Sequence, residues 1–271
     1  EEPMQILVKA RLFLDGEEQF VNLTIMDNGS GFPPEVMEIL NLAHELKAKQ
    51  KAGIEHHILK GKTLGMIFEK SSTRTRVSFE VGMYQLGGQA LFLSNRDLQI
   101  GRGEPIKDTA RVLSRYLDGV MIRTFGHEIV EEFAQYASIP VINALTDLLH
   151  PCQALTDLLT AQEHKGKDLK GLKMAYIGDG NNMTHSLMYA CAKVGMNFAS
   201  ASPKGYEPKP EFLSEFAHCV EVFDNAEDAA VNADLIVTDV WASMGQEEEQ
   251  KLREQAFANF QVNEKLMDIA H

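Results

Sequence analysis

The chain has 271 residues, enough for two domains of ordinary size, and 44% of them are hydrophobic, as in globular proteins. Its 26 Lys and Arg residues against 39 Asp and Glu residues give a formal net charge of −13, which argues against a general binder of nucleic acid or of anionic membranes. No apolar run approaches the roughly 18 residues that cross a bilayer, so no membrane partner is expected. The three cysteines, Cys152, Cys191 and Cys219, fit neither a disulfide framework nor a zinc site, which favours the reducing cytoplasm.

Residues 1–33 form a segment of their own, whose role the sequence leaves open. Apolar and polar residues alternate over positions 6–14 and again over 23–25, on either side of Asp15-Gly16, which predicts a β-hairpin. The segment runs into Asp27-Asn28-Gly29-Ser30-Gly31, which resembles the adenine-binding glycine box of histidine-kinase-type ATPase domains. That resemblance implies an ATP-binding regulator as one alternative. A Gly-rich turn that ends the hairpin is the other.

From Pro34 the pattern changes to helical spacing as far as Lys51, and apolar runs then alternate with helical segments. The apolar runs cover residues 63–68, 90–94, 119–123, 140–144, 173–177, 197–201, 219–223 and 235–240. Four runs precede a long helix that begins near His150, and four follow it. We therefore predict an α/β fold with two lobes, 34–149 and 150–271, each a parallel sheet with crossover helices.

The first candidate site follows the run 63–68 and opens a helix. Ser72 is placed to cap this helix, and the apolar face of the helix includes Val77, Val81 and Tyr84. Three hydroxyls and two guanidiniums within residues 72–76 would surround an anion at the helix N-terminus, where the dipole adds to the attraction. The pattern indicates a phosphate site, and a hydroxyl-rich cap with two solvated arginines is the alternative.

Three motifs follow one another along the chain: Ser-Thr-Arg-Thr-Arg at 72–76, His-Pro-Cys-Gln at 150–153 and Asp-Val-Trp-Ala-Ser-Met-Gly at 239–245. In order and spacing they resemble the ornithine carbamoyltransferases of the transcarbamoylase family, over residues 35–271. The first two motifs are shared across transcarbamoylases, and the third points to ornithine. The resemblance implies an enzyme that transfers the carbamoyl group of carbamoyl phosphate to the side-chain amine of L-ornithine, giving L-citrulline and phosphate.

The resemblance also implies which residues bind carbamoyl phosphate: Ser72, Thr73, Arg74, Thr75, Gln99, Arg123, His150 and Gln153. Residues 72–75 would hold the phosphate, His150 would donate to the carbamoyl carbonyl, and Gln153 would accept from the carbamoyl amide. Arg123 ends an apolar run, which is where open α/β sheets bind their ligands. In the family the position of Gln99 reaches into the neighbouring subunit's site, which implies a homo-oligomer, a trimer or a multiple of trimers.

For ornithine, the resemblance assigns Asn182 to the α-carboxylate end, Asp239 to the α-amino group, and Ser243 and Met244 to a loop that closes over the substrate. A carboxylate and an amide suit a zwitterion, because each charged end then has a partner. The catalytic residues implied are Arg123, His150 and Asp239. The resemblance implies no metal and no organic cofactor.

Family members continue beyond the position that matches His271 with a His-Cys-Leu-Pro motif, whose cysteine lies against the ornithine side chain. We therefore expect a C-terminally truncated member of the family with lowered turnover. A catalytically impaired carbamoyl-phosphate-binding or scaffold protein is the alternative.

Overall fold

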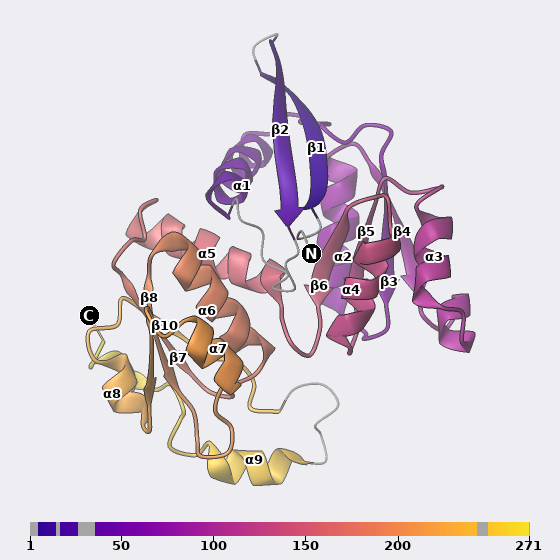
Figure 1. The fold of residues 1–271 in the computed structure, drawn as a ribbon. Helices are drawn as coiled ribbons and strands as arrows, with labels where there is room; N and C mark the ends of the chain where they lie inside the picture. The colour runs from indigo at the N-terminus through magenta and orange to yellow at the C-terminus, as the bar shows by residue number, and fades with distance from the viewer. Residues whose placement is uncertain (1–4, 15–16, 27–35, 243–248, 271) are drawn as a thin grey trace. The chain divides into compact units, whose positions relative to one another are not determined.

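The computed structural model describes residues 5–14, 17–26, 36–242 and 249–270. The chain divides into two compact units, Glu1–Cys152 and Gln153–His271 (Figure 1). None of the described helices is both long enough and apolar enough to cross a membrane. The glycine-box residues Asp27 to Gly31 lie outside the described residues.

The predicted hairpin is confirmed. Strands β1 (Gln5–Leu14) and β2 (Glu17–Met26) pair antiparallel, with Leu14 opposite Glu17 and Gln5 opposite Met26. Among the described strands they form a two-stranded sheet separate from the other two sheets.

After α1 (Val36–Lys51), the first unit contains a four-stranded parallel sheet of order β4-β3-β5-β6. Its strands are β3 (Thr63–Phe68), β4 (Gln89–Ser94), β5 (Gly119–Arg123) and β6 (Val141–Leu145). The connecting elements are α2 (Thr73–Gln85), the 3₁₀ turn η1 (Gln99–Arg102), α3 (Ile106–Leu113) and α4 (His127–Tyr136). The predicted strands are thus confirmed, with boundaries within one residue.

The two faces of this sheet pack on different helices because successive side chains of a strand point to opposite faces. Ile67, Val120 and Ile122 pack with α3 and α4 on one face. Met66 and Met121 pack with α2 on the other. Burial on both faces explains why these strands read as unbroken apolar runs.

The apolar stripe of α2 lies outside the core of the first unit. Its apolar side chains Val77, Val81 and Tyr84 are 50%, 45% and 79% exposed, so this face does not join the core. Met83 is the buried residue of the helix. Helical spacing identifies an apolar stripe but not what the stripe packs against.

The second unit holds a parallel sheet of order β10-β7-β8-β9. Its strands are β7 (Lys173–Ile177), β8 (Asn197–Ala201), β9 (Val220–Phe223) and β10 (Leu235–Val237). Its helices are α5 (Pro151–Lys165), α6 (Asn182–Val194), α7 (Pro210–Glu215), α8 (Ala226–Ala230), α9 (Gln250–Ala256) and α10 (Glu264–Met267). Helix α8 covers the face opposite to that of α6 and α7 (Figure 1).

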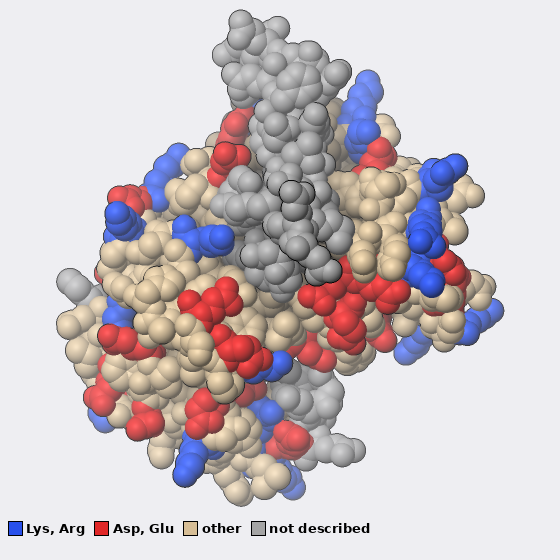
Figure 2. All heavy atoms as spheres, in the orientation of Figure 1, with Lys and Arg blue, Asp and Glu red and all other residues tan. Residues whose placement is uncertain are grey.

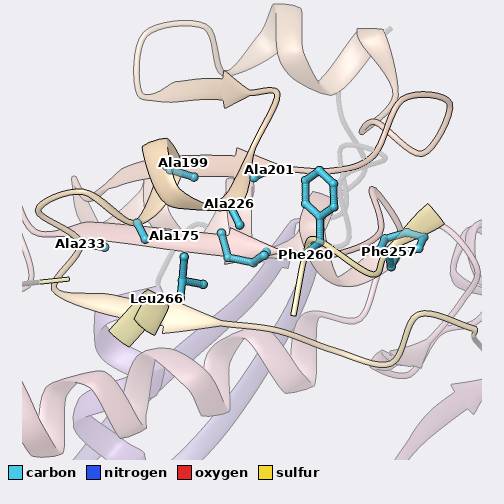
Figure 3. Close-up of a cluster of buried hydrophobic side chains, with 11 residues drawn as sticks. Ala175, Ala199, Ala201, Ala226, Ala233, Phe257, Phe260 and Leu266 are labelled. Carbon is cyan, nitrogen blue, oxygen red and sulfur yellow. The ribbon is translucent and has the colours of Figure 1, made fainter. Parts of the chain in front are cut away.

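The core beneath α8 is built from small residues (Figure 3). Ala175 and Ala199 on the sheet cluster with Ala226, the first residue of α8, and with Ala233, three residues after its end, and this lets the helix backbone lie close to the strands. Phe257 and Leu266, from the last part of the chain, complete the same cluster. The C-terminal helices are therefore part of this unit's core.

The last strand is shorter than the predicted run 235–240. It ends at Val237, because the Thr238 hydroxyl donates to the Ile177 carbonyl at 2.8 Å and the Asp239 carboxylate accepts from its neighbour's N–H. Asp239 thus lies just past the strand, in the loop that leaves the sheet.

Each sheet has a point at which the strand order reverses. In the first unit it lies between β3 and β5, and in the second between β7 and β10. Open α/β sheets bind ligands at the carboxyl ends of the strands flanking such a point. Of the sequence-predicted residues, Arg123 ends β5 and Asp239 lies two residues after β10.

Candidate active site

The carboxyl end of β3 carries the hydroxyl-rich motif into α2. Ser72 has extended backbone geometry and caps the helix: its Oγ accepts from the Thr75 N–H at 3.3 Å and donates to the Thr75 hydroxyl at 3.0 Å. Thr73 and Arg74 occupy the first turn, where N–H groups have no intrahelical acceptor. The predicted cap is confirmed, and this helix end can attract an anion.

An open pocket of about 610 Å³ lies beside this helix end and is lined by residues that include Ser72, Thr73, Arg76 and Phe92. Arg76 stacks on Phe92, 3.9 Å from the ring centroid, and pairs with Glu80 at 3.0 Å, so its guanidinium is already engaged. Gly101 of η1 lines the same pocket, two residues after the exposed Gln99.

Arg123 is brought to this region by β5. It is only 5% exposed, and the strand pairing shifts register at this residue, an irregularity that re-aims a side chain. Burial, reinforced by the positive charge of Arg74, lowers the pKa of Arg123. Its Nε finds no hydrogen-bond partner among the described residues. The guanidiniums of Arg74 and Arg123 repel each other, and a bound anion would relieve this repulsion. The pair therefore favours anion binding.

His150 immediately precedes α5 and belongs to the same cluster. Burial, and next the charge of Arg123, lowers its pKa to about 4. The imidazole is therefore neutral at pH 7 and has one N–H to donate. The structure thus brings Arg74, Arg123 and His150 together from three segments of the first unit.

One acidic patch lies on the surface of the first unit. Figure 2 shows acidic side chains gathered where α4 lies, a helix that contains Glu128, Glu131 and Glu132.

The remaining residues of the His-Pro-Cys-Gln motif differ in role. Burial raises the pKa of Cys152 to about 11, and its thiol donates to the Asn143 carbonyl, which makes it a packed group and not a nucleophile. Gln153 is exposed, and its Nε2 donates to Asp157 Oδ1 at 2.9 Å, one turn further along α5. The sequence analysis did not identify Asp157. Its position four residues after Gln153 in a predicted helix would have indicated this contact.

In the second unit, β7 leads into the cap of α6. The Asn181 side chain caps this helix by accepting from the Met183 N–H at 2.9 Å, and Asn182 is the first residue of the helix. Asp239 follows β10 and is exposed.

The charges around this edge are mainly negative. Burial raises the pKa of Asp157 and of Asp179, and the negative charge of Asp239 raises both further. Arg253 opposes the shift at Asp179, since its Nη1 lies 2.8 Å from Asp179 Oδ2. An acidic edge suits a substrate that carries ammonium groups. Ser243 and Met244 lie outside the described residues.

Arg253 was also missed in the sequence, because its partners are distant in the chain. It is 7% exposed, donates to the Trp241 carbonyl at 3.0 Å and pairs with Glu249 at 3.1 Å. It thereby connects the loop after β7 with the loop after β10.

Comparison with known proteins agrees with this arrangement. The family model described as "Aspartate/ornithine carbamoyltransferase, carbamoyl-P binding domain" matches residues 31–163, and its companion "Asp/Orn binding domain" matches residues 170–271. The ornithine carbamoyltransferase of Acinetobacter baumannii (strain AYE) is 67% identical over 237 residues, which cover 88% of this chain and 77% of that protein. The chain belongs to the ornithine carbamoyltransferase family.

Other members of the ornithine carbamoyltransferase family agree. That of Anoxybacillus flavithermus is 63% identical over 243 residues, covering 87% of this chain and 77% of that protein. The solved structure of the Pyrococcus furiosus ornithine carbamoyltransferase superposes with a TM-score of 0.82 at 51% identity, covering 88% of this chain and 78% of that one. The fold predicted from the transcarbamoylase resemblance is confirmed.

Proposed function

We propose that this chain transfers the carbamoyl group of carbamoyl phosphate to the side-chain amine of L-ornithine, giving L-citrulline and phosphate. The convergence of Arg74, Arg123 and His150 at the carboxyl ends of β3, β5 and β6 carries this proposal. Residues 34–149 then form the carbamoyl-phosphate-binding domain and residues 150–271 the ornithine-binding domain.

The reaction is an attack on a mixed anhydride. The neutral amine of ornithine forms a bond to the carbonyl carbon, the bond from that carbon to the phosphate oxygen breaks, and the amine loses a proton. Negative charge grows on the carbonyl oxygen during attack and on the phosphate during departure. Pre-positioned donors for both groups are the main requirement, and the leaving group is activated without metal or organic cofactor.

The helix end at Ser72 to Thr75 receives the phosphate in this scheme, together with Arg74. His150 donates its N–H to the carbonyl oxygen, a task for which a neutral imidazole suffices. Arg123, as a fixed positive charge, stabilises the negative charge on the carbonyl oxygen and on the departing phosphate. Its burial strengthens this attraction, because water screens it less.

Gln153 recognises the amide group of carbamoyl phosphate in this scheme. Its own NH₂ is used by Asp157, so its carbonyl oxygen Oε1 is left to accept from the carbamoyl NH₂. A carboxylate only accepts hydrogen bonds, and this determines the direction of the Gln153 amide.

The second substrate is proposed to bind at the acidic edge of the second unit. Asp239 pairs with the α-amino group, Asn182 meets the α-carboxylate, and Ser243 and Met244 contribute from the following loop. Ornithine brings two amino groups and one carboxylate, so the negative charge of this edge supports the assignment.

We further propose a cytoplasmic homo-oligomer, a trimer or a multiple of trimers. The exposed apolar residues of α2, with the half-exposed Leu91 and Phe92 of edge strand β4, offer a surface of the kind that subunits cover. The exposed Gln99 is assigned to the neighbouring subunit's site.

The test is citrulline formation from carbamoyl phosphate and L-ornithine, with Asp239→Asn and Arg123→Met as variants. We expect turnover in the wild type, loss of ornithine use in the first variant and loss of carbamoyl phosphate affinity in the second. Calorimetric binding of carbamoyl phosphate without any citrulline would instead support the catalytically impaired binding protein. ATP binding without either would support the regulator.

A further inference from the structure

Two charged residues between β3 and the hydroxyl-rich motif have no part in the mechanism above. Glu69 and Lys70 follow β3, and their backbone N–H groups both point to the Arg123 carbonyl, at 2.9 and 3.5 Å. Their side chains then diverge to two different loops.

The Glu69 side chain reaches the loop after β5. Its Oε2 accepts from the hydroxyl of Thr124, which is buried, and from the Phe125 N–H at 3.5 Å. Thr124 directly follows Arg123. This contact therefore helps to fix the backbone at the end of β5 and, with it, the direction of the Arg123 side chain.

The Lys70 side chain reaches the loop after β6. This side chain is 6% exposed, and its ammonium pairs with the Asp147 carboxylate and lies 4.2 Å from the centroid of the Phe125 ring. Asp147 lies three residues before His150. A buried ammonium is costly without a partner, so this pair holds the β6 loop against the β3 loop.

Backbone contacts join the same loops to one another. The Thr124 N–H donates to the Leu145 carbonyl at 3.0 Å, and the Asp147 N–H donates to the Phe125 carbonyl at 2.9 Å. The segments that carry Arg74, Arg123 and His150 are thus linked at the carboxyl ends of β3, β5 and β6.

We propose that Glu69 and Lys70 are positioning residues for the carbamoyl phosphate site, which set the mutual distance of the β3, β5 and β6 loops. The proposal rests on the proposed function of those loops. Neither side chain touches the substrate in this scheme: Lys70 acts through Asp147, and Glu69 acts through Thr124.

The chain offers a matched control at the opposite end of the same strands. Lys62 precedes β3 and pairs at 2.8 Å with Asp118, which precedes β5, and both side chains are more than one-third exposed. Lys62→Met removes an ammonium that links the starts of β3 and β5, at the end of these strands away from the loops. It should leave every readout within twofold of wild type.

Lys70→Met is the main variant, because Asp147 is 63% exposed and its carboxylate can then be hydrated. We expect the KM for carbamoyl phosphate to rise about tenfold, with the KM for ornithine and kcat at saturation within about twofold. Glu69→Gln should raise the KM for carbamoyl phosphate in the same direction. An unchanged KM in Lys70→Met, or an equal effect in Lys62→Met, would overturn the proposal.

Asp147→Asn separates a positioning role from direct contact and guards against misfolding, since its side chain is exposed. If Lys70 acts through Asp147, the double variant Lys70→Met/Asp147→Asn has the KM of Lys70→Met alone. Multiplied effects of the two changes would mean that Lys70 contacts the phosphate itself, which contradicts the proposal.

A ligand-independent readout separates this proposal from the proposed function. Amide hydrogen exchange of residues 123–125 and 145–150 should be about tenfold faster in Lys70→Met than in wild type and unchanged in Lys62→Met. Absence of citrulline formation by the wild type would refute the function only. Unaltered exchange in Lys70→Met would refute the positioning role.

Discussion

Arg253 Nη1 lies 2.8 Å from Asp179 Oδ2, and both side chains are less than one-tenth exposed. The same Nη1 donates to the Trp241 carbonyl at 3.0 Å, and the guanidinium lies 4.9 Å from the centre of the Tyr206 ring. This buried pair joins the loop that precedes Asn182 to the loop that follows Asp239. The geometry of the proposed ornithine site therefore depends on it.

Replacing Arg253 by Met should lower the free energy of unfolding by about 3–5 kcal/mol, because Asp179 would remain as a buried, unpaired carboxylate. Adding Asp179→Asn should recover part of this loss. Urea titration measures both. Lys265→Met, which removes an exposed ion pair with Glu227 in the same unit, should cost at most about 1 kcal/mol. Equal losses in Arg253→Met and Lys265→Met would contradict the structural role.

His150 gives the protein a pH dependence with a defined direction. Its pKa falls from 6.5 in the unfolded chain to about 4 in the fold, so between these values the unfolded chain binds the extra proton. Stability from this group is complete above pH 6.5 and is lost as the pH falls toward 4. Thermal unfolding of His150→Gln should show a smaller loss between pH 7 and 4.5 than wild type. Parallel curves for the two proteins would show that the imidazole is not desolvated.

Asp157 should control the choice of acyl group through Gln153. Asparagine can donate as well as accept, so Asp157→Asn no longer determines the direction of the Gln153 amide. We expect the KM for carbamoyl phosphate to rise several-fold, whereas inhibition by acetyl phosphate, which has a methyl group in place of the NH₂, stays unchanged.

A matched pair serves as control for this change. Gln250 donates to Glu254 at 2.9 Å with the same four-residue spacing on α9. Glu254→Gln should leave both constants unchanged. Equal weakening of carbamoyl and acetyl phosphate in Asp157→Asn would show only a general disturbance of α5.

Arg74 should matter for the phosphate itself. Arg74→Ala removes a charge-assisted contact at the end of α2, and binding of carbamoyl phosphate should weaken by roughly 2–4 kcal/mol in calorimetry. Arg111→Ala is the control, because it removes an arginine of the same unit that stacks on Tyr136 and pairs with Asp108, outside the motif. It should leave the dissociation constant unchanged. A dissociation constant unaffected by Arg74→Ala would show that the motif is only a helix cap.

The hairpin should be dispensable for anion binding. Its two strands pair with one another and join neither four-stranded sheet among the described residues. A chain that lacks residues 1–33 is expected to bind phosphate within a few-fold of the full chain. Loss of phosphate affinity in this deletion would make the hairpin an integral part of the first unit.

The strands of the fold could be predicted because burial on both faces requires continuous apolar runs, as in 119–123 and 173–177. The helix cap at Ser72 could also be predicted, because it depends only on the Ser72 side chain and the first turn of the helix that follows. Such features need only neighbours in the chain.

What could not be predicted depends on distant partners. Lys70 and Asp147 are 77 residues apart, and Arg253 and Asp179 are 74 apart, so no local pattern relates them. The exposed Val77 illustrates the same limit, because its environment is set by what lies opposite the helix. The early end of β10 at Val237 likewise follows from the Thr238 hydroxyl bonding to another strand.

The Glu69 contact with Thr124 spans 55 residues of chain and exists only when β3 and β5 lie side by side. An anion bound between these strand ends is therefore a ligand of the folded state alone. At a concentration one hundred times its dissociation constant, it would add about 2.7 kcal/mol to the free energy of unfolding. Free phosphate, a product of the proposed reaction, should therefore slow proteolysis of the first unit even when no ornithine is present.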